Sequence, residues 1–195
     1  SKYCVVVEGN LDVVSSHQAG VRQCVATAGT AVTESHLQAL SKFTQDIRLC
    51  FDRDGAGLNA TERAIEIAQG LDIKLSVIDI EGAKDPDELI QKDPNAWLEA
   101  ITKPIYAMDW LIARYAQSYD ISTASGKKSF TDHMIRAVRR LTDSVEREHY
   151  LDKIAEMSDV SSAAMRSKFS QKDSEPEERR RKTAHIDLNE VRPDH

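Results

Sequence analysis

Short apolar runs alternate with helical stretches along the first half of this 195-residue chain. Runs rich in β-branched and apolar residues predict strands at 3–7, 22–27, 46–51 and 73–80. Apolar residues at helical spacing predict helices between these strands at 11–19, 33–43 and 56–69. Thr33 is the expected N-cap of the second helix. This alternation favours an α/β fold with a parallel sheet of about four strands, covered by helices on both faces.

The character of the sequence changes after Pro86, where the strand signals stop. Helical periodicity then dominates, with a loop expected at 121–128 and helical segments at 86–101, 104–117, 126–143, 145–157 and about 160–169. The last stretch is charged and almost without apolar residues, which is typical of a disordered linker. We therefore expect an α/β domain over 1–101, an all-α subdomain over 102–170 and a linker over 171–195.

Composition narrows the class of protein. The net charge of −6 argues against a protein that binds nucleic acid by overall electrostatic attraction alone. No apolar run approaches the roughly 20 residues of a membrane span, and no signal peptide is visible. Cys4, Cys24 and Cys50 have no CxxC spacing, so neither a zinc site nor a disulfide framework is expected. The sequence predicts a cytoplasmic protein with reduced, buried cysteines.

Carboxylates follow three of the four predicted strands. They are Glu8 and Asp12 after the first strand, Asp52 and Asp54 after the third, and Asp85 and Asp87 after the fourth. Because the carboxyl ends of parallel strands meet at one edge of a sheet, we expect these acids to gather there. Like charges at close range are unfavourable unless a cation relieves them, and Mg²⁺ prefers oxygen ligands. The pattern therefore predicts a divalent metal site.

Each acidic motif also has another explanation when it is taken alone. DRDGAG fails as a calcium loop, because Ala56 and Arg63 occupy the fifth and twelfth positions. It fails as the DxDGT motif of haloacid-dehalogenase phosphatases, because Ala56 replaces Thr and the motif follows the third strand instead of the first. KDPDELI is equally typical of a helix start, with Pro86 at the first position and acids that favour the helix dipole. The coincidence of all three motifs at one edge favours the metal.

Four segments, in their order and spacing, resemble the Toprim half of a bacterial DnaG-type primase. They are VVVEGNLDVV, ATAGTAVTESHL, LCFDRDGAG and KDPDELI. The early Glu-Gly and the later DxD are shared by all Toprim proteins, which include topoisomerases and OLD-type nucleases. The four segments together point more specifically to the primases. The resemblance covers about residues 1–170. It implies a Toprim domain, which is a Rossmann-like α/β fold, followed by the helical subdomain of the primase RNA polymerase core.

The resemblance also implies roles for individual residues. Glu8, Asp52 and Asp54 match the catalytic metal-binding acids of the family, and Asp85 and Asp87 match a further pair at the metal. The supporting residues are Asp12, Gly9, Gly55, Gly57 and Arg53. Arg53 stands where the family usually has Gly, and we expect it either to contact phosphate or to face solvent. The expected cofactor is Mg²⁺, for which Mn²⁺ substitutes, and zinc is not expected in this part of a primase.

The implied activity is that of a DNA-directed RNA polymerase, a nucleotidyltransferase that makes RNA primers on single-stranded DNA from nucleoside triphosphates. A primase works at the bacterial replication fork within the primosome, so no membrane partner is expected. We expect this chain to be a fragment with little or no activity alone, and to reach the replicative helicase through an absent C-terminal domain. Two alternatives stay open: a Toprim nuclease or topoisomerase fragment, and a non-catalytic replisome interaction module.

Overall fold

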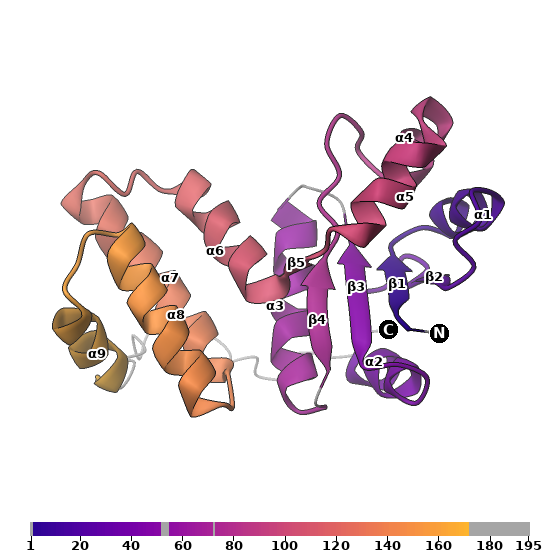
Figure 1. The fold of residues 1–195 in the computed structure, drawn as a ribbon. Coiled ribbons are helices and arrows are strands. Elements are labelled where there is room, and N and C mark those ends of the chain that lie inside the picture. The colour runs from indigo at the N-terminus through magenta and orange to yellow at the C-terminus, as the bar shows by residue number, and fades with distance from the viewer. Residues whose placement is uncertain (1, 52–54, 72, 172–195) are drawn as a thin grey trace, which may run out of the picture.

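A computed structural model describes residues 2–51, 55–71 and 73–171, and shows an α/β layer joined to a bundle of helices (Figure 1). The strands are β1 (Cys4–Val7), β2 (Cys24–Ala26), β3 (Asp46–Cys50), β4 (Lys74–Val77) and β5 (Ile105–Tyr106). They form one sheet in the order β2-β1-β3-β4-β5. The first four strands are parallel, as predicted, and β5 pairs antiparallel with β4. The antiparallel strand was not predicted, because two residues are too few to show a strand period.

Helices cover both faces of the sheet. Successive side chains of a strand point to opposite faces, and here the apolar side chains on both faces need to be buried. Val5 and Val7 of β1 pack in a core with α1 (Asn10–Gln18), α4 (Pro86–Lys92) and α5 (Pro94–Thr102). Val6 faces the opposite side and packs with α2 (Glu34–Ser41) and α3 (Gly55–Gln69). Both faces are therefore buried, as a mainly parallel sheet requires.

The remaining helices extend the core on the α3 side of the sheet. They are α6 (Ala107–Ser118), α7 (Ala124–Arg140), α8 (Ser144–Met157) and α9 (Ser162–Ser170). Leu111 of α6, Met134 of α7 and Leu151 of α8 belong to the same apolar cluster as Val6. The sheet and the helical bundle therefore share one continuous core on this side. In the parts of the chain described here, no helix is both long and apolar enough to cross a membrane.

Several boundaries differ from the sequence expectations for local reasons. The segment predicted at 86–101 divides into α4 and α5, because Asp93 ends the first helix and caps the second ahead of Pro94. The loop expected at 121–128 is shorter, since Thr123 caps α7 and the helix starts at the next residue. Thr33 is the N-cap of α2, as predicted. All three cysteines are free and buried, which confirms that expectation. Of the predicted linker at 171–195, only Gln171 lies within the described residues.

Candidate functional site

The strand order creates a switch point between β1 and β3. The chain leaves β1 for β2 on one side, and later returns to place β3 on the other side of β1. In open α/β sheets, ligands bind in the crevice at the carboxyl ends of the strands at such a point. Val7 and Cys50 are paired in the register, so the two residues that follow them, Glu8 and Phe51, leave neighbouring strands together. The first acidic motif therefore starts where a ligand crevice is expected.

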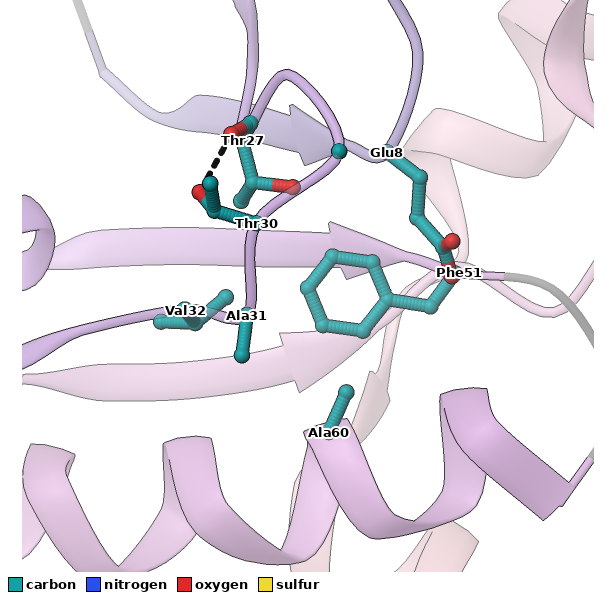
Figure 2. Close-up of a pocket in the computed structure, with 8 residues that line it drawn as sticks. Glu8, Thr27, Thr30, Ala31, Val32, Phe51 and Ala60 are labelled. Atoms are coloured by element: carbon teal, nitrogen blue, oxygen red, sulfur yellow. Dashed lines mark hydrogen bonds between the residues drawn. The ribbon is translucent and has the colours of Figure 1, made fainter. Parts of the chain in front are cut away.

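A cavity of about 260 Å³ opens at this switch point (Figure 2). Glu8 and Phe51 line it from the ends of β1 and β3, and Ala60 closes it from α3. The loop after β2 supplies the remaining wall, and its lining residues are Thr27, Gly29, Thr30, Ala31 and Val32. In Figure 2 the ring of Phe51 lies between this loop and α3. The cavity therefore combines a carboxylate at its rim with hydroxyl and apolar groups behind it.

The loop after β2 makes a tight turn over the cavity. Ala28 and Gly29 both have positive φ, at 55° and 76°, and the Thr30 hydroxyl donates a hydrogen bond to the Thr27 carbonyl at 2.6 Å. The Thr27 N–H donates to the Val7 carbonyl at 3.0 Å, which ties the turn to the end of β1. An alanine with positive φ is uncommon, and such strain is often found at functional sites. Thr27 and Thr30 were not predicted as site residues, although ATAGTAVT indicates a turn of small residues after a strand.

Asp12, one of the predicted supporting residues, is buried and bonded to backbone. Its Oδ2 atom accepts a hydrogen bond from the Gly9 N–H at 3.0 Å, and its Oδ1 atom accepts one from the Asp87 N–H at 3.1 Å. Gly9 is another of the predicted supporting residues. In the structure, a Cβ at Gly9 would lie 2.9 Å from Asp12 Oδ2, so the space is taken by that carboxylate. Gly57 lies in the first turn of α3, and its carbonyl accepts a hydrogen bond from the Thr61 hydroxyl at 2.9 Å.

The two acids of KDPDELI lie at the start of α4, and each accepts hydrogen bonds from the protein. Asp85 is the N-cap of α4, and its side chain accepts a hydrogen bond from the Glu88 N–H at 2.8 Å. The Asp87 carboxylate accepts hydrogen bonds from the Ser15 hydroxyl and from the Gln91 amide. Both predicted metal ligands therefore accept hydrogen bonds from protein donors and lie at a helix start, and their role as metal ligands stays a prediction.

The predicted metal ligands are only partly within the described chain. Asp52, Arg53 and Asp54 lie outside it, and Gly55 is described as the first residue of α3. Over residues 2–51, 55–71 and 73–171, no three acidic, histidine or cysteine side chains converge as a metal-binding group. Among the described residues, Glu8 is the predicted ligand that lines the cavity. The Glu8 carboxylate is a hard oxygen donor of the kind that Mg²⁺ prefers. In the sequence, the DxD segment comes directly after β3, the neighbour of β1.

Comparisons with known proteins give two family matches. A model described as Toprim-like matches residues 5–90, and one described as the DnaB-helicase binding domain of primase matches residues 108–163. The second match covers most of α6 to α9. From the sequence alone, we expected the helicase contact to lie in an absent C-terminal domain.

Individual relatives and structures agree with these models. The DNA primase of Rickettsia bellii is 34% identical over 154 residues, which are 76% of this chain and 25% of that protein. The DNA primase of Synechococcus elongatus is 31% identical over 159 residues, covering 78% of this chain and 23% of that protein. A DNA primase domain from Pseudomonas aeruginosa has the same fold, with a TM-score of 0.70 and 25% identity over 86% of this chain and 54% of that one. This chain thus spans about a quarter of the length of the curated relatives it matches.

Proposed function

We propose, from the correspondence of this chain in sequence and fold to the Toprim and helical parts of bacterial DnaG-type DNA primases, that it forms the metal-binding half of a primer-synthesising enzyme. The observation that carries the proposal is the position of Glu8, at a cavity where the switch point of the sheet lies. The DxD segment follows β3, the neighbour of β1. The similarity to primases and the topology of the sheet therefore both favour a ligand site beside Glu8.

In this proposal Glu8, Asp52 and Asp54 hold Mg²⁺. The bound metal would activate the 3′-hydroxyl of the primer and neutralise the triphosphate of the incoming nucleotide. The turn at 27–30 and the ring of Phe51 line the cavity beside Glu8. Arg53 would contact the phosphates. We propose a smaller ligand set than the sequence predicted: Asp85 and Asp87 already accept hydrogen bonds from protein groups, and we assign them to the support of α4.

The proposed partners are single-stranded DNA, an RNA primer, nucleoside triphosphates and the replicative helicase. A DnaG primase catalytic domain with a TM-score of 0.70 to this chain has been solved bound to single-stranded DNA. The helicase model over residues 108–163 supports a helicase contact on the helical bundle. We also propose that the boundary between the Toprim domain and the helical subdomain lies between residues 101 and 102. The protein would act in the bacterial cytoplasm, at the replication fork. Since the relatives are about four times longer, the chain is expected to need their other parts for primer synthesis.

The test is reconstitution of primer synthesis. The purified chain is mixed with the remaining parts of a related primase, labelled single-stranded DNA and nucleoside triphosphates. We expect Mg²⁺-dependent RNA products that Glu8→Gln reduces by at least 100-fold. Glu156→Gln is the matched control, because Glu156 is an exposed acid on α8, far from β1 in sequence. Cleavage of the DNA in place of synthesis would identify a Toprim nuclease and refute the proposal.

A second candidate function is a non-catalytic interaction module, which the helicase-binding match favours. It predicts that the chain retains the replicative helicase on a column whether or not Glu8 is intact. If the helicase binds but the reconstituted mixture makes no primer at any Mg²⁺ concentration, this second function replaces the first.

A further inference from the structure

Asp12 is a buried carboxylate for which the proposed chemistry has no direct use. It is 7% exposed, and a carboxylate at this depth is costly unless donors satisfy it. Its two oxygens accept hydrogen bonds from two backbone N–H groups, those of Gly9 and Asp87. Gly9 directly follows Glu8, and Asp87 lies in the first turn of α4. Asp12 thus joins the loop that carries Glu8 to the start of a helix 75 residues further along the chain.

A second contact strengthens this connection between α1 and α4. Ser15, one turn after Asp12 on α1, donates its hydroxyl hydrogen bond to the Asp87 carboxylate. The Gln91 amide donates to the other oxygen of Asp87 at 2.8 Å. We call Asp12, Ser15 and Asp87 the α1–α4 seam. Asp12 and Ser15 of α1 both form hydrogen bonds with Asp87 of α4, and these bonds hold the two helices together at the sheet edge.

Gly9 shows that space at the seam is limited. Its φ and ψ are −102° and 152°, an extended conformation that any residue adopts, so backbone freedom does not require glycine here. A Cβ at this position would instead lie 2.9 Å from Asp12 Oδ2, closer than real Cβ contacts. Glycine therefore permits the Asp12 carboxylate to reach the backbone beside Glu8.

We propose that Asp12 is a positioning residue, which holds Glu8 at the cavity by fixing the Gly9 backbone to α4, and does not itself bind the metal. This inference rests on the proposed function, because it concerns the placement of a metal ligand. Asparagine keeps one acceptor oxygen and places an NH₂ group opposite the other backbone N–H. Loss of a residue that orients a metal ligand typically weakens metal binding about 10–100-fold.

The test measures Mn²⁺ binding to the full 195-residue chain, with Mn²⁺ alone as the probe and free Mn²⁺ read by electron paramagnetic resonance. Asp12→Asn and Gly9→Ala are each expected to weaken binding about 10–100-fold, because both disturb the same contact. The control is Asp143→Asn, which alters an N-cap carboxylate on α8 outside the seam. Thermal unfolding checks that each variant folds. If Asp12→Asn does not fold, the test is made with Gly9→Ala.

A double variant separates positioning from ligation. If Asp12 acts through Glu8, the double variant Glu8→Gln with Asp12→Asn binds Mn²⁺ no more weakly than Glu8→Gln alone. A further tenfold loss in the double variant would identify Asp12 as a ligand and overturn the proposal. If Asp12→Asn and Gly9→Ala bind Mn²⁺ as tightly as the wild type while Glu8→Gln binds it more weakly, the positioning role of Asp12 is refuted and the proposed function stands. A wild-type chain that binds no Mn²⁺, or a Glu8→Gln variant that binds equally well, overturns the proposed function and this role with it.

Discussion

Replacement of Gly126 by alanine should destabilise the helical bundle, although alanine is the better helix former. Gly126 lies in the first turn of α7, and its N–H donates to the Thr123 hydroxyl oxygen at 3.0 Å. A Cβ at Gly126 would lie 1.9 Å from the Asp120 carbonyl oxygen, where ordinary contact begins at 3.4 Å. The backbone at Asp120 or at α7 must therefore move by about 1.5 Å, the difference between these two distances.

The cost follows from the contacts that such a movement breaks. The Asp120 carbonyl accepts hydrogen bonds from the Thr123 N–H and hydroxyl, at 3.1 and 2.9 Å. Losing these bonds and the Thr123 cap costs about 3 kcal/mol, against about 1 kcal/mol gained from helix propensity. The net loss of about 2 kcal/mol lowers Tm by about 4–8 °C in a chain of this size.

The assay is urea unfolding followed by circular dichroism, with Gly70→Ala as the matched control. Gly70 follows α3, its φ is outside the left-handed region, and its Cβ would meet nothing closer than the Ile67 carbonyl at 3.7 Å. We expect Gly70→Ala to leave stability unchanged or to raise it by up to about 1 kcal/mol. A Gly126→Ala variant as stable as Gly70→Ala would refute the steric reasoning.

Three further predictions concern single side chains. Asp85→Ser should keep the α4 cap and Asp85→Ala should cost about 1 kcal/mol, and neither should change Mn²⁺ affinity; weaker Mn²⁺ binding by both would return Asp85 to the ligand set. Tyr115→Phe, which removes the hydrogen bond to Glu62 between α6 and α3, should lower the unfolding free energy by about 1 kcal/mol in urea titrations. Burial raises the pKa of Cys24 to about 11 from its usual 9.0, so the stability that its protonated thiol contributes is complete below pH 9 and lost as pH rises toward 11. Cys24→Ala should flatten that alkaline loss, and an unchanged slope would contradict it.

Local signals predicted the elements that local physics controls. Strand periodicity gave the four parallel strands, and the hydroxyl of Thr33 marked the start of α2, because these depend on neighbours in sequence. The short strand β5 exists only through its pairing with β4, which no pattern in Ile105 and Tyr106 reveals. The split at Asp93 was visible as an Asp-Pro pair, but the helical period of the surrounding residues outweighed it.

The position of Glu8 in the candidate site was predictable from the sequence, but the hydrogen bonds around it were not. The alternation of strands and helices places Glu8 at a sheet edge, and the structure adds the cavity with Thr27 and Thr30 behind it. The bond from Ser15 to Asp87 joins residues 72 positions apart. Such a contact depends on which helix lies beside α1, and this is set by tertiary packing, not by the spacing of either motif.

The path of the chain gives different surroundings to the acids that follow the first and fourth predicted strands. After β4 the chain does not stay at the end of its own strand; α4 and α5 lie over the face that α1 also covers, and α4 contacts α1 (Figure 1). Asp85 and Asp87 therefore arrive with a helix N-terminus, whose free N–H groups are ready donors for carboxylates. Asp12 of α1 accepts a hydrogen bond from one of these groups, the Asp87 N–H. Glu8 instead follows β1 into the crevice beside β3 and lines the cavity, whereas Asp85 and Asp87 lie at the start of α4, which Asp12 connects to the Gly9 backbone.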